Sequence, residues 1–110
     1  MTVPDIDATV RRELLFREVN ERIFDIAGSE SDELEILCEC GDDSCISTLV
    51  ITVGDYRRVR QETSRFVVCL GHELGHVERV IERTPAHLVV EKIGRAREVV
   101  NRGLAERDAL

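Results

Sequence analysis

Three cysteines, Cys38, Cys40 and Cys45, lie within eight residues of one another, and a Gly-His-Glu segment that contains His72 follows about thirty residues later. Thiolate and imidazole are the ligands that zinc prefers, and a structural zinc site takes four of them. Free cysteines are often simply small buried side chains. The polar residues 42–44 between the second and third cysteine do not resemble a core segment, so the spacing predicts one shared Zn²⁺ site.

The fourth ligand has several candidates: His72, His76, Cys69 and an aspartate of the cysteine loop. Cys69 ends an apolar run, where an inert buried thiol is the commoner outcome. His72 follows Gly71, at a point where a side chain can leave a sheet edge and reach a neighbouring loop. We therefore favour His72 over Cys69 as the fourth ligand.

The segment from His72 to His76 also has the sequence His-Glu-x-x-His, which in metallopeptidases binds zinc through two histidines and activates a water through the glutamate, here Glu73. That chemistry requires a stable helix. Gly71 precedes the motif and Gly75 interrupts it, and each glycine costs a helix about 1 kcal/mol relative to alanine. A zinc metallopeptidase is therefore the alternative function rather than the preferred one.

Length and composition indicate one domain over residues 1–110. The chain is 43% hydrophobic and 34% charged, and it contains no run of roughly 18 apolar residues, so we expect no membrane span. The first residues are neither basic nor apolar enough for a secretion signal. We therefore expect a cytoplasmic protein, in which closely spaced cysteines bind metal rather than form disulfides.

The formal net charge of −7 makes the average surface repel phosphate. This charge argues against a nucleic-acid-binding module and is compatible with an unidentified protein partner. Lys92 is the only lysine among fifteen basic residues, a bias that we attribute to genome composition.

Hydrophobic periodicity predicts a helix over residues 9–27, a polar linker over 29–33 and strands over 34–38 and 47–52, which the cysteine loop joins. The apolar residues expected to form one core face of the first helix are Val10, Leu14, Val19, Ile23 and Ile26.

A capping box at Thr52 and Asp55 predicts a short helix over 53–61 with Tyr56 and Val59 facing the core. We expect Arg57, Arg58 and Arg60 to form its solvated face.

An apolar strand is predicted over residues 65–70. Residues 77–83 and 87–93 flank a turn at 84–86 and are predicted to be strands, although the first segment also fits a helix face. His87 is expected to be an exposed turn residue. A final helix begins at Gly94, with Ala96, Val99, Val100 and Leu104 on its apolar side. Together these elements predict an α+β fold: a small, mainly antiparallel sheet with helices near both ends and a zinc-binding loop.

The chain resembles an uncharacterised bacterial family of short acidic proteins with a Cys-x-Cys-x4-Cys and Gly-His-Glu pattern. The segments that carry the resemblance are 16–23, 38–42 with Cys45, Tyr56 with 59–60, 63–68, 71–73, 77–83 and 88–92.

The family pattern keeps the three cysteines and the Gly-His-Glu but neither His76 nor Cys69. The resemblance therefore implies a Cys3His site made by Cys38, Cys40, Cys45 and His72, and it implies no activity. The function that we expect is that of a zinc-stabilised interaction or regulatory module.

Overall fold

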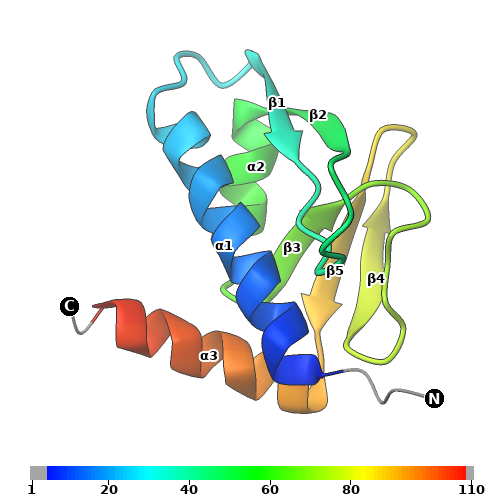
Figure 1. Cartoon of the computed structure of the whole chain (residues 1–110). Helices are drawn as coiled ribbons and strands as arrows, with labels where there is room; N and C mark the ends of the chain where they lie inside the picture. Colours follow the sequence, from blue (N-terminus) through cyan, green and yellow to red (C-terminus); the bar gives the residue numbers. More distant parts are fainter. Residues whose placement is uncertain (1–4, 109–110) are drawn as a thin grey trace.

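The computed structural model of the chain describes residues 5–108, which form three helices and two small antiparallel sheets (Figure 1). The predicted α+β class is confirmed, although the strands divide into two sheets where one was expected. The elements are α1 (Ile6–Asp25), β1 (Glu33–Leu37), β2 (Thr48–Thr52), α2 (Val53–Arg60), β3 (Arg65–Val68), β4 (Glu78–Arg83), β5 (Leu88–Lys92) and α3 (Gly94–Asp108).

The first sheet is the antiparallel pair β1 and β2, whose connection is the cysteine loop. The second sheet has the order β3-β5-β4 and is antiparallel throughout. The segment that also fitted a helix face is therefore a strand, with an irregularity in the register between Val80 and Glu82. The cap predicted for α2 is present, since the Thr52 side chain accepts a hydrogen bond from the Asp55 N–H at 3.1 Å.

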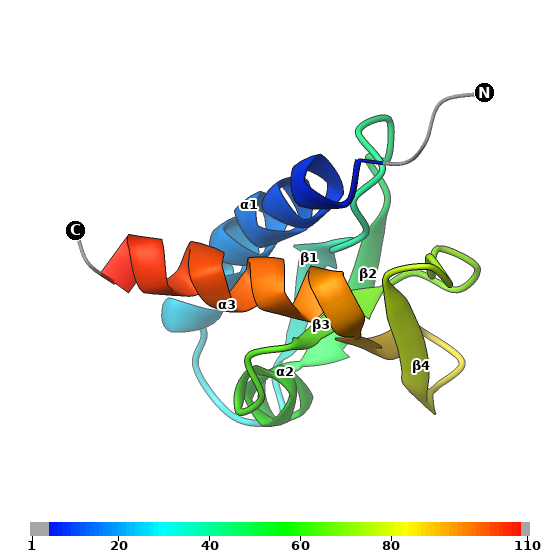
Figure 2. The same cartoon turned by 90° about the horizontal axis from the view of Figure 1, so that it is seen from below.

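In the three-stranded sheet, β3 and β5 are buried on both faces, which explains why β3 is a continuous apolar run rather than an alternating one. Strand β4 has exposed residues at alternate positions. Phe66 and Val68 lie in a cluster with residues of α1, α3 and the cysteine loop, whereas Val67 lies in a second cluster with β1, β2 and α2. Figure 2 shows α1 and α3 crossing on one side of this sheet and α2 on the other. The cysteine loop thus borders the first cluster.

Helix α1 does not bury the face that its apolar residues predict. Its buried residues are Val10, Glu13, Arg17 and Asn20. Val19 and Ile26 are 40% and 87% exposed, so the predicted core face is wrong at these two positions. The physical reason is that the inner side of α1 meets charged and polar groups of the loop and sheet.

One of these groups is Lys92, which is fully buried at the end of β5 and forms ion pairs with Glu13 of α1 and Glu78 of β4. Its ammonium also lies 5.0 Å from the centre of the Phe66 ring. Burial raises the pKa of Glu13 to about 8, although Lys92 opposes this shift. The triad therefore joins three elements through polar contacts that water does not reach.

The structure corrects the prediction for His87, which is only 5% exposed instead of lying free in a turn. Thr84 closes the turn, because its N–H and its hydroxyl both donate hydrogen bonds to the His87 carbonyl. Within the described residues, His87 Nδ1 has no hydrogen-bond partner. Burial lowers the pKa of His87 below its ordinary value of 6.5.

We expect this burial to destabilise the protein in mild acid. Below about pH 6.5 the unfolded chain binds a proton at His87 that the folded chain does not bind. The contribution of His87 to the free energy of unfolding therefore falls as the pH falls, by at most about 1.4 kcal/mol per unit. His87→Gln should flatten this slope in urea titrations between pH 7 and 5. The matched control is His76→Gln, which removes an exposed imidazole; equal slopes for both variants would contradict the assignment.

No helix within residues 5–108 combines the length and apolar character needed to cross a membrane.

Candidate metal centre

The structure brings Cys38, Cys40, Cys45 and His72 together, with all their ligand atoms within 4.8 Å of one another. The three thiols come from the β1–β2 connection and the imidazole from the β3–β4 connection. His72 Nδ1 lies 3.5 Å from Cys38 Sγ, 3.7 Å from Cys40 Sγ and 3.5 Å from Cys45 Sγ. A single nitrogen therefore faces three sulfurs at nearly equal distances.

These distances fit a tetrahedral metal centre. Zn–S bonds of about 2.3 Å and Zn–N bonds of about 2.05 Å at tetrahedral angles place nitrogen and sulfur about 3.6 Å apart. The three Nδ1–Sγ distances lie within about 0.1 Å of this value. The four side chains could therefore hold a metal ion, and their nitrogen–sulfur distances are those of a tetrahedral site.

Hydrogen bonds within the cysteine loop hold its turn. Asp42 accepts hydrogen bonds from the Ser44 N–H and hydroxyl, at 2.9 and 2.7 Å, and its carbonyl accepts from the Cys45 N–H. Gly41 lies against α1, where a Cβ atom would stand 2.8 Å from the Thr9 carbonyl oxygen. Glycine is required there because the loop approaches the helix closely, and not because its φ angle is positive.

His72 reaches the thiols through a tight turn after β3. The His72 N–H donates to the Cys69 carbonyl at 3.0 Å, and Gly71, at the third position of this turn, has φ +81°. Turns of this kind need a positive φ at that position, which glycine adopts without strain. Gly71 therefore aims the imidazole back toward the cysteine loop.

The other candidate ligands lie outside the cluster. The Cys69 backbone N–H donates to Cys38 Sγ at 3.1 Å, while its thiol contacts the Thr48 carbonyl. His76 is exposed, and residues 72–76 form loop and turns rather than the helix that a metallopeptidase motif requires. Glu73 lies 3.9 Å from Arg83. The local structure therefore does not support metal binding through His72 and His76 together.

Glu39, between the first two cysteines, is a functional residue that sequence reasoning missed. Its side chain is fully buried and accepts hydrogen bonds from Asn20 Nδ2, the Tyr56 hydroxyl and the Val67 N–H, each at 2.9 Å. The Glu39 N–H donates in turn to the Val67 carbonyl. Glu39 thus joins the cysteine loop by hydrogen bonds to α1, α2 and the edge of β3.

Asn20 reinforces this attachment from α1. Its side-chain oxygen accepts from the Leu37 N–H and its Nδ2 donates to the Leu37 carbonyl, both at 2.9 Å. The amide therefore pairs with the backbone immediately before Cys38 as a neighbouring strand would.

Arg60 corrects the prediction that all three arginines of α2 are solvated. Its side chain is 11% exposed and approaches Glu39, with Nη2 3.6 Å from Oε1. The guanidinium lies over the rings of Tyr56 and Phe66. Burial, followed by the Glu39 charge, raises the pKa of Tyr56, so its hydroxyl remains a donor.

The thiols are electrostatically unequal. The hydrogen bond from Cys38 is the main cause that lowers the pKa of Cys40 to about 5, against the effect of burial and with help from the Asp42 N–H and His72. The pKa of Cys38 is raised, because its thiol donates that hydrogen bond and is buried. Cys40 is therefore the thiolate that forms first.

A sequence signal for Glu39 exists in retrospect, because it is a charged residue between two cysteines directly after an apolar strand. Its partners lie 17 to 28 residues away along the chain, so local patterns do not identify them. Comparisons of this chain with protein-family profiles, with curated proteins and with solved structures gave no match.

Proposed function

We propose that this chain binds one Zn²⁺ through Cys38, Cys40, Cys45 and His72, and that the metal stabilises a small interaction or regulatory module. The proposal rests on the distances from His72 Nδ1 to the three cysteine sulfurs. All three are close to the nitrogen–sulfur distance expected in a tetrahedral zinc site. Three thiolates with one imidazole suit zinc better than calcium or magnesium, which prefer oxygen ligands.

The centre would be structural rather than catalytic. Four protein ligands fill the coordination sphere of zinc and leave no position for water or a substrate. Zinc would supply the positive charge that allows three thiolates to lie close together. The protein's own part is to hold the ligands: Gly71 directs His72, and Glu39 fastens the cysteine loop to three other elements.

A module of this kind acts through its surface. The net charge of −7 favours a protein partner and disfavours nucleic acid. The proposal also places the chain in a reducing compartment, the bacterial cytoplasm, because the three thiols bind metal only when they are reduced.

Elemental analysis with X-ray absorption at the zinc edge tests the proposal. We expect one zinc per chain, with three sulfur ligands and one nitrogen ligand. The His72→Ala variant should lose the nitrogen ligand, whereas His76→Ala should leave the spectrum unchanged. A shell dominated by nitrogen and oxygen, or purified protein that does not take up zinc, would overturn the assignment.

A further inference from the structure

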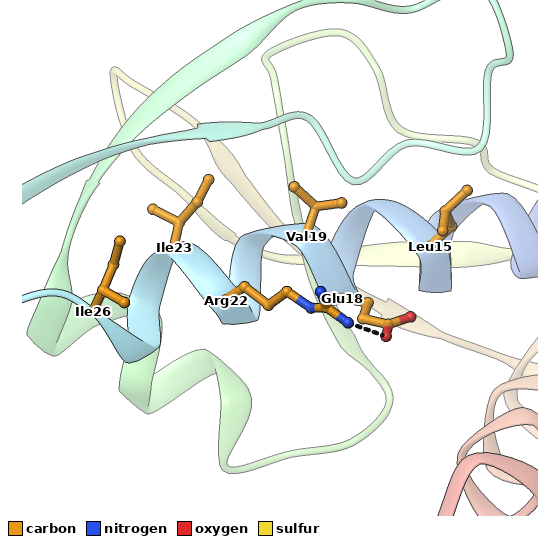
Figure 3. Close-up of a pocket in the computed structure, with 6 residues that line it drawn as sticks. All are labelled: Leu15, Glu18, Val19, Arg22, Ile23 and Ile26. Atoms are coloured by element: carbon orange, nitrogen blue, oxygen red, sulfur yellow. Dashed lines mark hydrogen bonds and ion pairs between the residues drawn. The ribbon is translucent and has the colours of Figure 1, made fainter.

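Helix α1 carries an apolar stripe on its outer face. Figure 3 shows this α1 stripe together with Glu18 and Arg22, which lie beside it and form an ion pair at 3.4 Å. The residues of the α1 stripe are Leu15, Val19, Ile23 and Ile26. Leu15 is 56% exposed and Ile26 is 87% exposed. The six residues line a groove of about 550 Å³.

The stripe reverses the usual arrangement of an amphipathic helix. Three of the four buried residues of α1 are charged or polar, namely Glu13, Arg17 and Asn20. Of the stripe, Leu15, Val19 and Ile26 are exposed, whereas Ile23 is partly buried against the second core cluster. At about 100° per residue, the stripe lies roughly 145° around the helix from the buried side. Scattered exposed apolar residues need no explanation, but a continuous row of them marks an interaction surface.

The apolar surface continues toward α3. Leu15 also lines a second groove, in which Leu14 of α1 meets Gly103 and Leu104 of α3. The surface therefore extends beyond a single helix ridge. The cysteine loop contacts α1 elsewhere, at Thr9 and Glu13, so the stripe is separate from the metal centre.

The order of residues along the stripe fits a second copy of this chain in the antiparallel direction. In an antiparallel pair with two-fold symmetry, residues face each other when their numbers add to a constant sum. The residue numbers of Leu15 and Ile26 add to 41, and those of Val19 and Ile23 add to 42. A two-fold axis near residues 20 and 21 therefore places apolar residues opposite apolar residues along the whole stripe.

The charges agree with the same axis. Glu18 and Arg22 add to 40, so each Glu18 faces Arg22 of the second copy, on the same flank of the helix pair. A parallel two-fold pair would instead place the Glu18 and Arg22 of the two copies on opposite flanks, where these charges would not meet. Because a membrane-surface helix has mainly basic flanks, the balanced pair beside the stripe also disfavours a lipid surface.

We propose that two copies of this chain associate through the α1 stripe as an antiparallel, two-fold symmetric helix pair. The inference gives the proposed interaction module a partner, and it does not depend on zinc at the metal centre. An interface made mainly by one helix is small, and small interfaces bind weakly. We therefore expect a concentration-dependent dimer rather than an obligate one.

Sedimentation velocity over a concentration series, on protein whose zinc content has been measured, tests the proposal. We expect the mass to rise from the 12.5 kDa monomer toward twice that value. Val19→Lys places two ammonium groups near the axis and should weaken association at least tenfold. Val50→Lys is the matched control, since Val50 is as exposed as Val19, and it should leave association unchanged.

Charge reversal tests the antiparallel direction. Glu18→Arg and Arg22→Glu should each weaken association several-fold, because each creates two like-charge contacts across the axis, and the double variant should restore it. Circular dichroism confirms that each variant is folded.

Three outcomes would overturn the proposal: a monomer at every concentration, a dimer indifferent to Val19→Lys, or a double variant as weak as the single ones. A monomer that binds lipid vesicles through the stripe would also overturn it. In each of these cases the zinc content would still report separately on the metal centre.

Discussion

Replacing Cys40 with serine is expected to abolish stoichiometric zinc and to unfold much of the chain. Structural zinc in small peptides contributes about 10 kcal/mol or more, which is comparable with the entire stability of a small domain, about 5 to 15 kcal/mol. Cys40 is also the thiol whose pKa is lowered to about 5, chiefly by the hydrogen bond from Cys38. The variant therefore loses the ligand that ionises most readily.

Elemental analysis and thermal unfolding measure this effect. At several degrees per kcal/mol for a domain of this size, the midpoint should fall by more than about 20 °C. Cys69→Ser is the matched control, because Cys69 lies beside the centre but contributes its backbone N–H to it. The control should keep one zinc per chain. A Cys40→Ser protein that also keeps one zinc would remove Cys40 from the site.

Replacing Lys92 with methionine should also destabilise the protein strongly, although less than the loss of zinc. Methionine fills a similar space but leaves Glu13 and Glu78 buried without a cation. Breaking a buried ion pair from one side typically costs 3–5 kcal/mol. Arg95→Met is the control for lost positive charge; its surface pair with Asp7 should contribute about 1 kcal/mol or less.

The loss at Lys92 should depend on pH in a defined direction. The pKa of Glu13 is raised by burial from 4.5 to about 8, so the folded chain binds a proton that the unfolded chain releases. Stability therefore decreases as the pH rises through this window. Without Lys92 this decrease should be steeper, and urea titrations at pH 5 and pH 8 should show it.

The triple variant Glu13→Gln, Glu78→Gln and Lys92→Met should recover most of the lost stability, because no charge of the triad remains buried. If the Lys92→Met variant were equally stable at pH 5 and pH 8, the triad would not be the source of the pH-dependent loss of stability.

Local patterns predicted the parts of this fold that depend on neighbours in sequence. Thr52 and Asp55 predicted the start of α2, and the residues around Pro85 predicted the turn between β4 and β5. Cysteine spacing predicted that the three thiols lie together. The boundaries differed by no more than three residues, as expected where hydrogen bonding at helix and strand ends varies.

The errors occurred where a residue's environment comes from distant segments. Periodicity assigned Val19 and Ile26 to the core because they are apolar, yet the inner side of α1 is occupied by Glu13 and Asn20, whose partners are on β5 and in the cysteine loop. Lys92 did give a signal, since a lone lysine ending an apolar strand is unusual among fourteen arginines. Composition alone could not reveal that Lys92 bridges two carboxylates.

The proposed ligands come from two segments that differ before the chain has folded. Cys38, Cys40 and Cys45 are neighbours in any conformation, whereas His72 joins them only once β3 and the turn at Gly71 have formed. During synthesis the three thiols leave the ribosome first. A metal ion bound first by the three thiols would therefore gain its fourth ligand only after β3 and the turn at Gly71 have formed.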